Sequence, residues 1–212
     1  MNRRNIKLLV AFVLVAVVGY NSVYIRKLSE VKAQGVGTKF NTTKYSREFW
    51  DSKLIPSLGN AIEVNQLMQE MHADKDRTFN TYAHALGIGN LQYFMIKGEG
   101  EVLAVNENTV TVKTQAGAET QNLQIETEYV YGNAVRDASG LLNMNAFDNT
   151  TEFNEVSAGI NKIIREEVIP SFKKTVAAGS KISFVGAIEL NKKFLDTSKI
   201  TLTPVQVKFL TK

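Results

Sequence analysis

Residues 91–114 read LQYFMIKGEGEVLAVNENTVTVKT, and the expected architecture follows from this segment. Apolar and polar residues alternate on both sides of Gly98 and Gly100, which is typical of one long strand that bends at its glycines. The polar residues 106–108 predict a turn, and residues 109–114 alternate again as a half-buried strand. The segment therefore predicts two consecutive strands of an antiparallel sheet, joined by a short turn.

Three more strands and one helix follow in the sequence. The same alternation predicts strands over residues 120–131, 181–190 and 200–210. Pro204 cannot donate to a strand ladder, so we expect the last strand to bulge or to lie at an edge there. The resulting order, β-β-β-α-β-β, is that of a small Greek-key barrel of the oligonucleotide/oligosaccharide-binding (OB) kind.

The helix between the third and fourth strands is predicted from an apolar stripe over residues 153–168, on which Arg165 is expected to face water. Asn149 is expected to cap its first turn. Pro170 removes a backbone donor, so we expect it to break or kink the helix.

Residues 44–86 precede the strands and carry apolar residues at helical spacings, with Pro56 and Gly59 separating two pieces. They predict a helical cap over residues 44–89, with the barrel over residues 90–212. The predicted fold class is therefore α+β, mainly β, with an OB-like pseudo-barrel of five strands. A last short helix of the cap is expected to hold Phe79, Tyr82, Ala83 and Leu86.

The amino-terminal residues 8–25 form a run of 18 residues without a charge. As a helix with a rise of about 1.5 Å per residue, they span about 27 Å, close to the hydrocarbon thickness of a bilayer. Tyr20 and Tyr24 occupy positions where interfacial aromatics are found. We therefore expect an uncleaved transmembrane helix within residues 1–27, followed by a juxtamembrane linker over residues 28–43.

A cleaved signal peptide is the alternative, because the basic start and the apolar residues 8–20 fit one as well. Cleavage after Gly19 would place Val17 at a position where a small residue is preferred. Both interpretations export the rest of the chain. The positive-inside rule then predicts a single-pass protein of the inner membrane whose carboxyl-terminal domain is periplasmic.

The net charge of +4 comes from the amino terminus. Five of the 25 basic residues lie within residues 1–27, which contain no acid, and the other 20 face 21 acidic residues, so the exported part carries about −1. Nucleic-acid binding requires a basic face, so we expect no nucleic-acid partner. The absence of cysteine excludes disulfides, thiol catalysis, cysteine metal sites and an acylated cysteine. No cofactor is expected.

Residues 132–138 read Gly-Asn-Ala-Val-Arg-Asp-Ala, a Gly-x-Ala-x-Arg-Asp-Ala block. With this block and several others, the chain resembles the predicted periplasmic lipoproteins catalogued as domain of unknown function 2291 over about residues 40–208. The other blocks that carry the resemblance are Phe40, Tyr45 and residues 50–58, 93–102, 186–187 and 203–205.

The resemblance implies an extracytoplasmic, membrane-tethered protein with an OB-like pseudo-barrel, often encoded beside sugar ABC transporters. A sugar ABC transporter component is therefore the implied partner. The chain departs from the family in two places. It has no lipobox cysteine, so a protein anchor must replace the lipid, and Thr127-Glu128 stand where Gly-Pro is expected.

Five residues are candidates for ligand binding: Arg136, Asp137, Asn133, Trp50 and Tyr93. A guanidinium can bind a carboxylate or sugar hydroxyls, with the aspartate orienting it. The aromatic rings could stack on a sugar. The interpretations that we favour are plainer: Arg136 pairs with a carboxylate inside the fold, Asp137 caps a turn, and Trp50 packs in the core.

Two acids and two histidines complete the candidates. Glu99 and Glu101 share a strand face like paired catalytic carboxylates, yet solvent-facing acids are the commoner case. Asp74 and Asp76 lie near His72, but surface histidines are expected rather than a metal site with His84.

Two functions follow from these observations. The first is a non-catalytic binding or accessory module of the cell envelope, linked through the family resemblance to a sugar ABC uptake system. The alternative is an envelope hydrolase that uses carboxylates such as Glu99, Glu101 or Asp137. No catalytic motif favours the second.

Overall fold

A computed structural model describes residues 3, 5, 12, 13, 15, 17, 40–87, 89–116 and 119–210. The chain divides into two units, Met1–Phe40 and Asn41–Lys212. Most of the expected membrane anchor and of the linker lies outside the described residues. Among the residues that are described, no helix is long and apolar enough to cross a bilayer.

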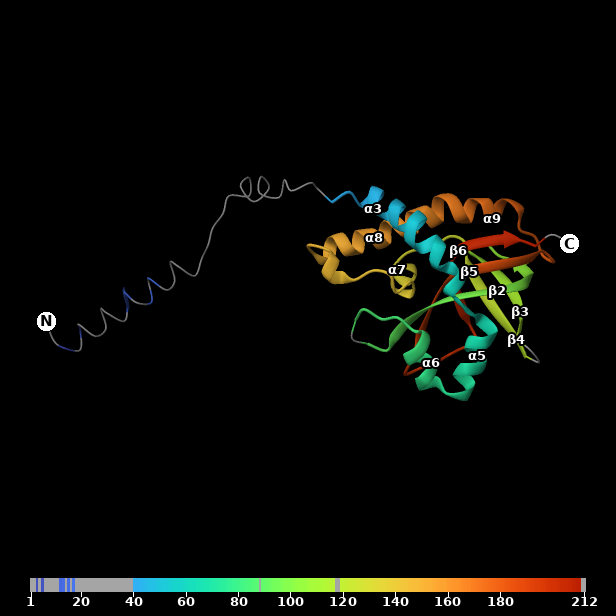
Figure 1. Cartoon of the computed structure of the whole chain (residues 1–212), viewed down its shortest axis with the longest axis horizontal. Coiled ribbons are helices and arrows are strands. Elements are labelled where there is room, and N and C mark those ends of the chain that lie inside the picture. Colours follow the sequence, from blue (N-terminus) through green and yellow to red (C-terminus); the bar gives the residue numbers. More distant parts are fainter. Residues whose placement is uncertain are drawn as a thin grey trace. The chain divides into compact units, whose positions relative to one another are not determined.

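Five strands close into a barrel in the order β2-β3-β4-β6-β5, because β2 pairs with both β3 and β5 (Figure 1). β4 and β6 are parallel neighbours, and the other barrel pairs are antiparallel. This agrees with the predicted order of strands and intervening helix. The five strands are β2 (Leu91–Val105), β3 (Thr109–Ala116), β4 (Glu119–Glu126), β5 (Lys181–Asn191) and β6 (Ile200–Phe209).

The long strand β2 changes partners at its glycines. It pairs with β5 from Leu91 to Glu101, but with β3 only from Gly100 onward. A Cβ on Gly100 would come 2.6 Å from the carbonyl oxygen of Lys113, so the strands can approach this closely only at a glycine. Before Gly100, the edge of β2 that faces away from β5 instead carries a short parallel pairing with β1 (Ile62–Glu63).

Pro204 lies at an irregularity of β6, as predicted. Val185 pairs with Gln206 and the next residue, Gly186, pairs with Pro204, so one residue of β6 is left over as a bulge. The pairing of β6 with β4 ends at Leu202, before the proline. The missing backbone donor of Pro204 therefore interrupts no pair with β4.

The helix between β4 and β5 does not break at Pro170, contrary to the expectation. α8 (Thr150–Ile163) continues through a π-helical turn, η4 (Ile164–Val168), into α9 (Ile169–Thr175). The backbone N–H of Ile169 bonds to the carbonyl of Ile164, and this wider turn places Pro170 in the first turn of α9. A proline is tolerated there because the first turn needs no intrahelical N–H partner.

The same arrangement occurs in the first helical segment. α3 (Thr42–Phe49) passes through the π-helical turn η1 (Trp50–Leu54) into α4 (Ile55–Ser57), which contains Pro56, and a 3₁₀ turn, η2 (Leu58–Asn60), ends the segment. The side chain of Asn41 caps α3 by accepting from the backbone N–H of Lys44. The helix therefore begins two residues before the predicted start of the helical cap at residue 44.

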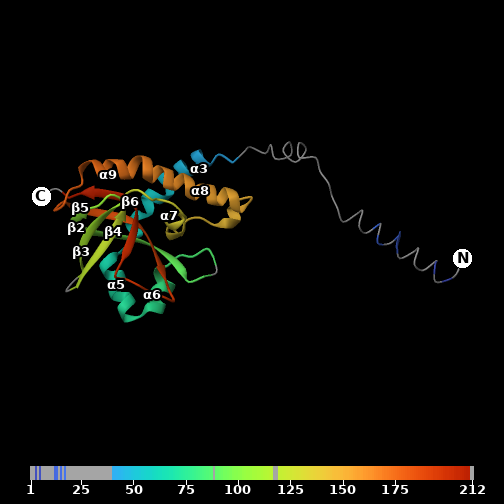
Figure 2. The ribbon, with the colours of Figure 1, turned by 180° about the vertical axis from the view of Figure 1, so that it is seen from behind.

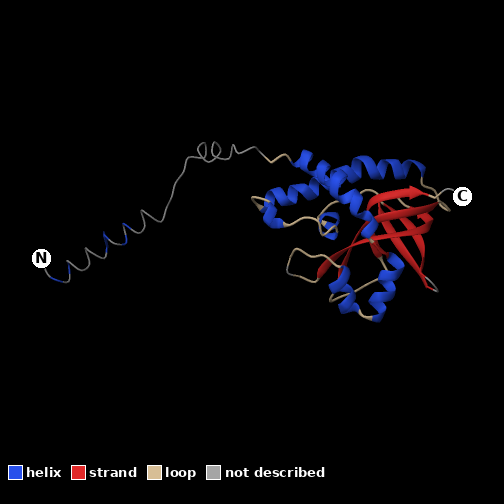
Figure 3. Cartoon of the chain, viewed as in Figure 1, coloured by secondary structure: helices blue, strands red, loops and turns tan. Residues whose placement is uncertain are grey.

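Helices cover opposite sides of the barrel: α8 and α9 lie on one side and α5 (Val64–Ala73) and α6 (Lys75–Tyr82) on the other (Figures 1 and 3). The view from behind in Figure 2 shows α3 beside α8. Thr42 donates to Glu155 at 2.7 Å across this contact. Gly159 of α8 allows the approach, since a Cβ there would lie 2.7 Å from the Cβ of Ser46.

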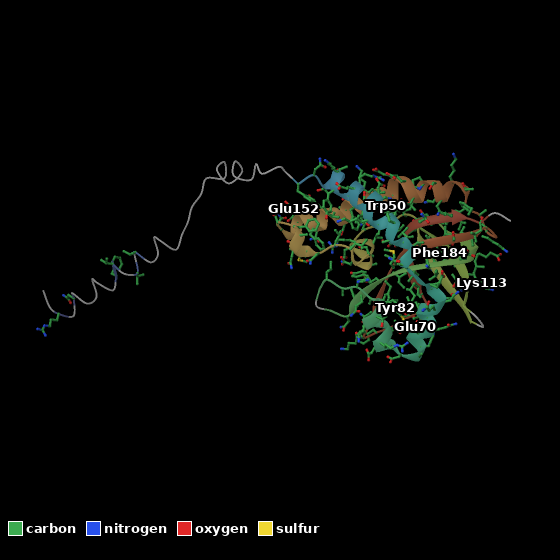
Figure 4. The ribbon with its side chains drawn as sticks, viewed as in Figure 1. Trp50, Glu70, Tyr82, Lys113, Glu152 and Phe184 are labelled. Carbon is green, nitrogen blue, oxygen red and sulfur yellow. The ribbon has the colours of Figure 1, made fainter. Side chains whose placement is uncertain are left out.

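The apolar core fills the barrel and the space under α5 and α6. Its larger side chains are Leu67, Phe79, Phe94, Ile96 and Phe184, all buried. Figure 4 shows Tyr82 beside Glu70, whose carboxylate accepts from the Tyr82 hydroxyl at 3.0 Å and joins the two helices. From Ile62 to Ala83, the segment predicted as a helical cap thus contributes side chains to the barrel core.

Three boundaries differ from the sequence predictions. Helix α6 ends at Tyr82, so Leu86 lies outside it and is 42% exposed. β4 ends at Glu126, and Tyr129 and Tyr131 are exposed in the segment that follows. The Arg-Asp block, for which the sequence predicted no helix, forms the short helix α7 (Ala134–Ala138). A short 3₁₀ turn, η3 (Met144–Ala146), precedes α8.

Candidate functional site

The short helix α7 holds three of the five candidate ligand-binding residues in one buried cluster. Gly132 has a positive φ of 78°, which turns the chain out of its extended path after β4, and Asn133 stands directly before the helix. Arg136 and Asp137 are only 6% and 3% exposed. Buried charges must find partners, and these two find each other.

Arg136 and Asp137 form a buried ion pair. The Nε of Arg136 donates to Oδ1 of Asp137 at 2.6 Å, and the side-chain amide of Asn133 donates to Oδ2 of the same carboxylate. Both oxygens of Asp137 are therefore engaged. The carboxylate that pairs with Arg136 thus belongs to the next residue in the sequence. This pairing is possible because the strand has ended and helix α7 turns both side chains inward.

Arg136 also fastens α7 to α8. Its Nη1 donates to the carbonyl of Phe153 at 3.3 Å and to Oδ1 of Asn154 at 3.1 Å. The guanidinium carbon lies 3.8 Å from the centre of the Phe153 ring, within the range of a cation–π contact. Bonds on three sides fix this arginine, so it forms a rigid wall of any neighbouring space.

Tyr93 reaches the same cluster from β2. Its hydroxyl donates to Oδ1 of Asn133 at 3.4 Å, which completes a chain from Tyr93 through Asn133 and Asp137 to Arg136. Burial raises the pKa of Tyr93, and the carboxylate of Glu189, its cross-strand partner, adds to that shift. The tyrosine therefore stays neutral and serves as a hydrogen-bond donor.

Two hollows lie on either side of Asn133. The first, here called the α8 hollow, has a volume of about 550 Å³ and is lined by Tyr131, Arg136, Asn154, Ser157, Asn161 and Arg165, among others. The second has a volume of about 400 Å³ and is lined by residues of the loop 85–90 with Tyr93, Asn133, Asp137 and Asn191. Of the two, the α8 hollow is the richer in polar side chains that can donate hydrogen bonds.

The α8 hollow combines an aromatic ring with amide and guanidinium groups. Arg165 is half-buried, its Nη1 donates to the carbonyl of Val130, and its guanidinium carbon lies 5.1 Å from the centre of the Tyr131 ring. Asn161 is 4% exposed and donates to the carbonyl of Gly132 at 2.8 Å. Planar polar groups beside an exposed aromatic ring are suited to a small, hydroxyl-rich molecule.

Arg165 was expected to face water, and the structure corrects this. Five residues of α8 and η4 line the hollow, Asn154, Ser157, Ala158, Asn161 and Arg165, and three of them, Ser157, Asn161 and Arg165, follow each other at intervals of four. This spacing places them on one helix face. The sequence therefore contained a signal for the hollow, namely a polar stripe beside the apolar stripe of α8 and η4. A prediction based on the apolar positions alone did not detect it.

The remaining candidates lie elsewhere. Trp50 is on η1 (Figure 4) and only 5% exposed, so its ring is covered by protein rather than open to stack on a solute. Glu99 and Glu101 are exposed and line a different hollow of about 510 Å³ together with Lys113 and Lys181.

The histidines do not come together with acids. His72 and His84 are both exposed, and Asp74 caps α6 by accepting from the backbone N–H of Arg77. Over the described part of the chain, no group of three or more histidine and acidic side chains is arranged to hold a metal ion.

Comparison with known proteins identifies relatives of the chain. A family model described as "Predicted periplasmic lipoprotein", domain of unknown function 2291, matches residues 13–208. Among solved structures, the chain is similar to an OB-fold protein from Thermotoga maritima, with 24% sequence identity and a TM-score of 0.72. The alignment covers 82% of this chain and 100% of that one. No curated protein matches. The structural likeness establishes an OB-type barrel and nothing about a ligand.

Proposed function

This chain belongs to the predicted periplasmic lipoprotein family, and we propose that it is a membrane-tethered, non-catalytic binding module that serves a sugar ABC uptake system. Its anchor is the apolar segment of residues 8–25, retained as a transmembrane helix of the inner membrane. Its ligand is a small, hydroxyl-rich solute held in the α8 hollow. Its partner is a component of the transporter.

The absence of cysteine supports a protein anchor. A bacterial lipoprotein is held by lipid on an amino-terminal cysteine, and this sequence contains none. Residues 8–25 are long and apolar enough to take over that task. A membrane helix also holds a protein more firmly than a single acyl chain does.

The α8 hollow is the observation on which the binding role rests. Three asparagines, two arginines and a tyrosine line it, and a buried cluster fixes one wall. Preformed walls reduce the ordering cost of binding. Its volume of about 550 Å³ is within the usual range for sites of small molecules.

The hydrolase alternative has less support from the geometry. Asp137 is 3% exposed and both of its oxygens accept hydrogen bonds, so it is poorly placed to exchange a proton with a substrate. Glu99 and Glu101 share their hollow with Glu63, Lys113 and Lys181, and all three carboxylates are exposed, whereas the carboxyl group of a general acid typically lies in a desolvated pocket. A non-catalytic role therefore remains the stronger proposal.

Fractionation of cells tests the anchor. The full-length chain is expected in the inner-membrane pellet after alkaline carbonate washing, with an intact mass that includes residues 1–27. A matched variant carrying Val13→Arg and Val15→Arg should lose this retention, because arginines at the middle of a helix oppose insertion. A soluble periplasmic product shortened near residue 19 would favour the cleaved signal peptide instead.

Thermal shift across a panel of sugars tests the binding role. We expect at least one sugar to raise the melting temperature of the wild type and not of Asn161→Leu, while Lys162→Gln, on the water-facing side of the same helix, responds like the wild type. Crosslinking in intact cells should capture a transporter component. If no sugar shifts the melting temperature and no transporter component is captured, the uptake role is wrong.

A further inference from the structure

We propose that the α8 hollow selects an acidic sugar, whose carboxylate binds Arg165 while its hydroxyls bind the amide side of the hollow. This inference rests on the proposed function and names its ligand class. It is carried by two features that the fold itself does not require. The first is an arginine without an acidic partner, and the second is a buried hydroxyl without any hydrogen-bond partner.

Arg165 differs from Arg136 in how its charge is compensated. Arg136 pairs with Asp137, so its positive charge is neutralised inside the protein. Arg165 donates to a backbone carbonyl and lies over Tyr131, and no acidic side chain of the described residues forms an ion pair with it. The α8 hollow therefore carries one uncompensated positive charge in a partly buried position.

A guanidinium in this setting recognises a carboxylate. It presents up to five N–H donors in a planar arrangement, and one contact with the Val130 carbonyl leaves others free for a second acceptor. Carboxylates accept two parallel bonds from such a group, and partial burial strengthens the attraction relative to water. A neutral hydroxyl at the same position would form a weaker hydrogen bond with the guanidinium than a carboxylate does.

Ser157 supplies the second observation. It is 6% exposed and lines the α8 hollow, and its hydroxyl oxygen has no hydrogen-bond partner. A helical serine usually donates to the carbonyl four residues earlier, which here is that of Phe153. That carbonyl already accepts from Arg136. The hydroxyl oxygen is covered by protein atoms, so a polar ligand reaches it only after the Ser157 side chain rotates toward the hollow, and the new hydrogen bond then offsets the cost of the unpaired group.

The asparagines determine where the hydroxyls of a ligand bind. Asn161 and Ser157 are one helical turn apart, and Arg165 is a further turn along the same face. A helix rises about 1.5 Å per residue, so the backbones of Ser157 and Arg165 are separated by about 12 Å along the axis. The long side chain of Arg165 reduces the distance between its guanidinium and the Ser157 end of the hollow, so that one sugar ring with its acid group fits between them.

Calorimetry with matched ligand pairs tests the inference on the full-length chain in detergent. Galacturonate and galactose differ only in a carboxylate against a hydroxymethyl group, and glucuronate and glucose form a second pair. We expect an acid to bind about tenfold more tightly than its neutral partner, as for one charge-assisted contact. The preference should shrink as the salt concentration rises.

Three variants assign the effect to the hollow. Arg165→Gln should remove the preference for the acid, because it weakens the binding of the acid about tenfold more than that of the neutral sugar. Lys162→Gln removes the same charge from the neighbouring exposed turn and should keep the preference. Ser157→Ala should weaken the binding of both members of a pair, while its melting temperature without ligand does not fall, because it removes an unpaired polar group.

The outcomes separate this inference from the proposed function. Equal binding of acids and neutral sugars, or a preference that survives in Arg165→Gln, would overturn the acidic ligand and leave a sugar-binding module. Binding of neutral sugars alone would do the same. Failure of every acid and every sugar to bind would overturn both.

Discussion

The barrel interior and the layer between α7 and α8 are both buried, yet they are built from opposite kinds of side chain. Phe94, Leu123 and Phe184 inside the barrel are at most 1% exposed and wholly apolar. The layer buries Arg136 and Asp137 to a similar degree. Apolar burial stabilises a fold by about 25 cal/mol per Å², whereas buried charges at best recover their desolvation cost.

The difference indicates how stability and function are divided in this molecule. The closed barrel needs nothing from the layer between α7 and α8 to bury its core, because its own strands with α5, α6 and α9 fill it. The polar layer accepts the cost of a buried ion pair and of the unpaired Ser157 hydroxyl. The ion pair and the unpaired hydroxyl lower the stability of the fold, and the ligand proposed for the α8 hollow gives a reason for their presence.

Truncation of Phe184 should give the largest loss of stability. Phe184 is 1% exposed and packs against Gly98 of the neighbouring strand, so Phe184→Ala leaves a cavity in the barrel and should cost about 3–5 kcal/mol of unfolding free energy. Phe194→Ala is the matched control, since Phe194 is 70% exposed and its loss should change stability by less than about 0.5 kcal/mol. Urea denaturation followed by circular dichroism measures both. Equal losses would mean that the barrel interior is not the main source of stability.

Removal of one partner from the buried ion pair should cost nearly as much. Asp137→Ala leaves the Arg136 charge buried without compensation, which typically costs about 3–5 kcal/mol. Replacement of both residues, in Arg136→Met with Asp137→Leu, should recover most of that loss in the same denaturation experiment. A double variant as unstable as the single one would show that the pair is needed for the fold, which would remove the contrast between the two regions.

The barrel could be predicted from sequence because its signals are local. Alternation with a period of two marks each strand, Pro204 marks the bulge of β6, and the glycines of β2 mark the place where β2 begins to pair with β3. The order of strands then restricts the topology to few choices. Closure of the barrel depends on the pairing of β2 with β5, which lie far apart in the sequence. The strand pattern alone does not predict this pairing.

The polar layer could not be predicted in the same way. Helix α7 depends on the turn at Gly132 and on a buried pair between adjacent residues, and a pattern of apolar residues does not report either. Pro170 was expected to break or kink the helix because propensities describe an α-helix, whereas here the helix continues through a π-helical turn. The spacing of Ser157, Asn161 and Arg165 was present in the sequence, but a polar face is normally solvated.

A smaller effect is expected where α3 crosses α8. Gly159→Ala places a Cβ 2.7 Å from the Cβ of Ser46, so the helices must separate, at a cost of about 1–3 kcal/mol. The better helix propensity of alanine offsets up to about 1 kcal/mol of this. Gly59→Ala is the control, because nothing lies within 4 Å of a Cβ there. A thermal unfolding midpoint for Gly159→Ala at or above that of the control would show that this crossing is not tightly packed.

The smallest effect should be a pH dependence at the rim of the barrel, where the apolar interior gives way to polar groups. Glu126 ends β4, and burial raises its pKa, while a hydrogen bond from Thr203 offsets part of the shift. Because its pKa is higher in the folded state than in the unfolded one, the folded state binds the proton more tightly. This contribution to stability is therefore complete below the ordinary glutamate pKa of about 4.3 and is lost as the pH rises through the raised value.

Comparison with Glu126→Gln isolates this contribution, since glutamine keeps the shape and does not titrate. The unfolding free energy of the wild type minus that of the variant should fall as the pH rises from about 4 to 7. A difference that stays constant would mean that the carboxylate is solvated in both states. A difference that rises would mean that it pairs with a cation when folded. Either result would mean that Glu126 lies outside the apolar barrel interior, which would then end earlier along β4 than the structure indicates.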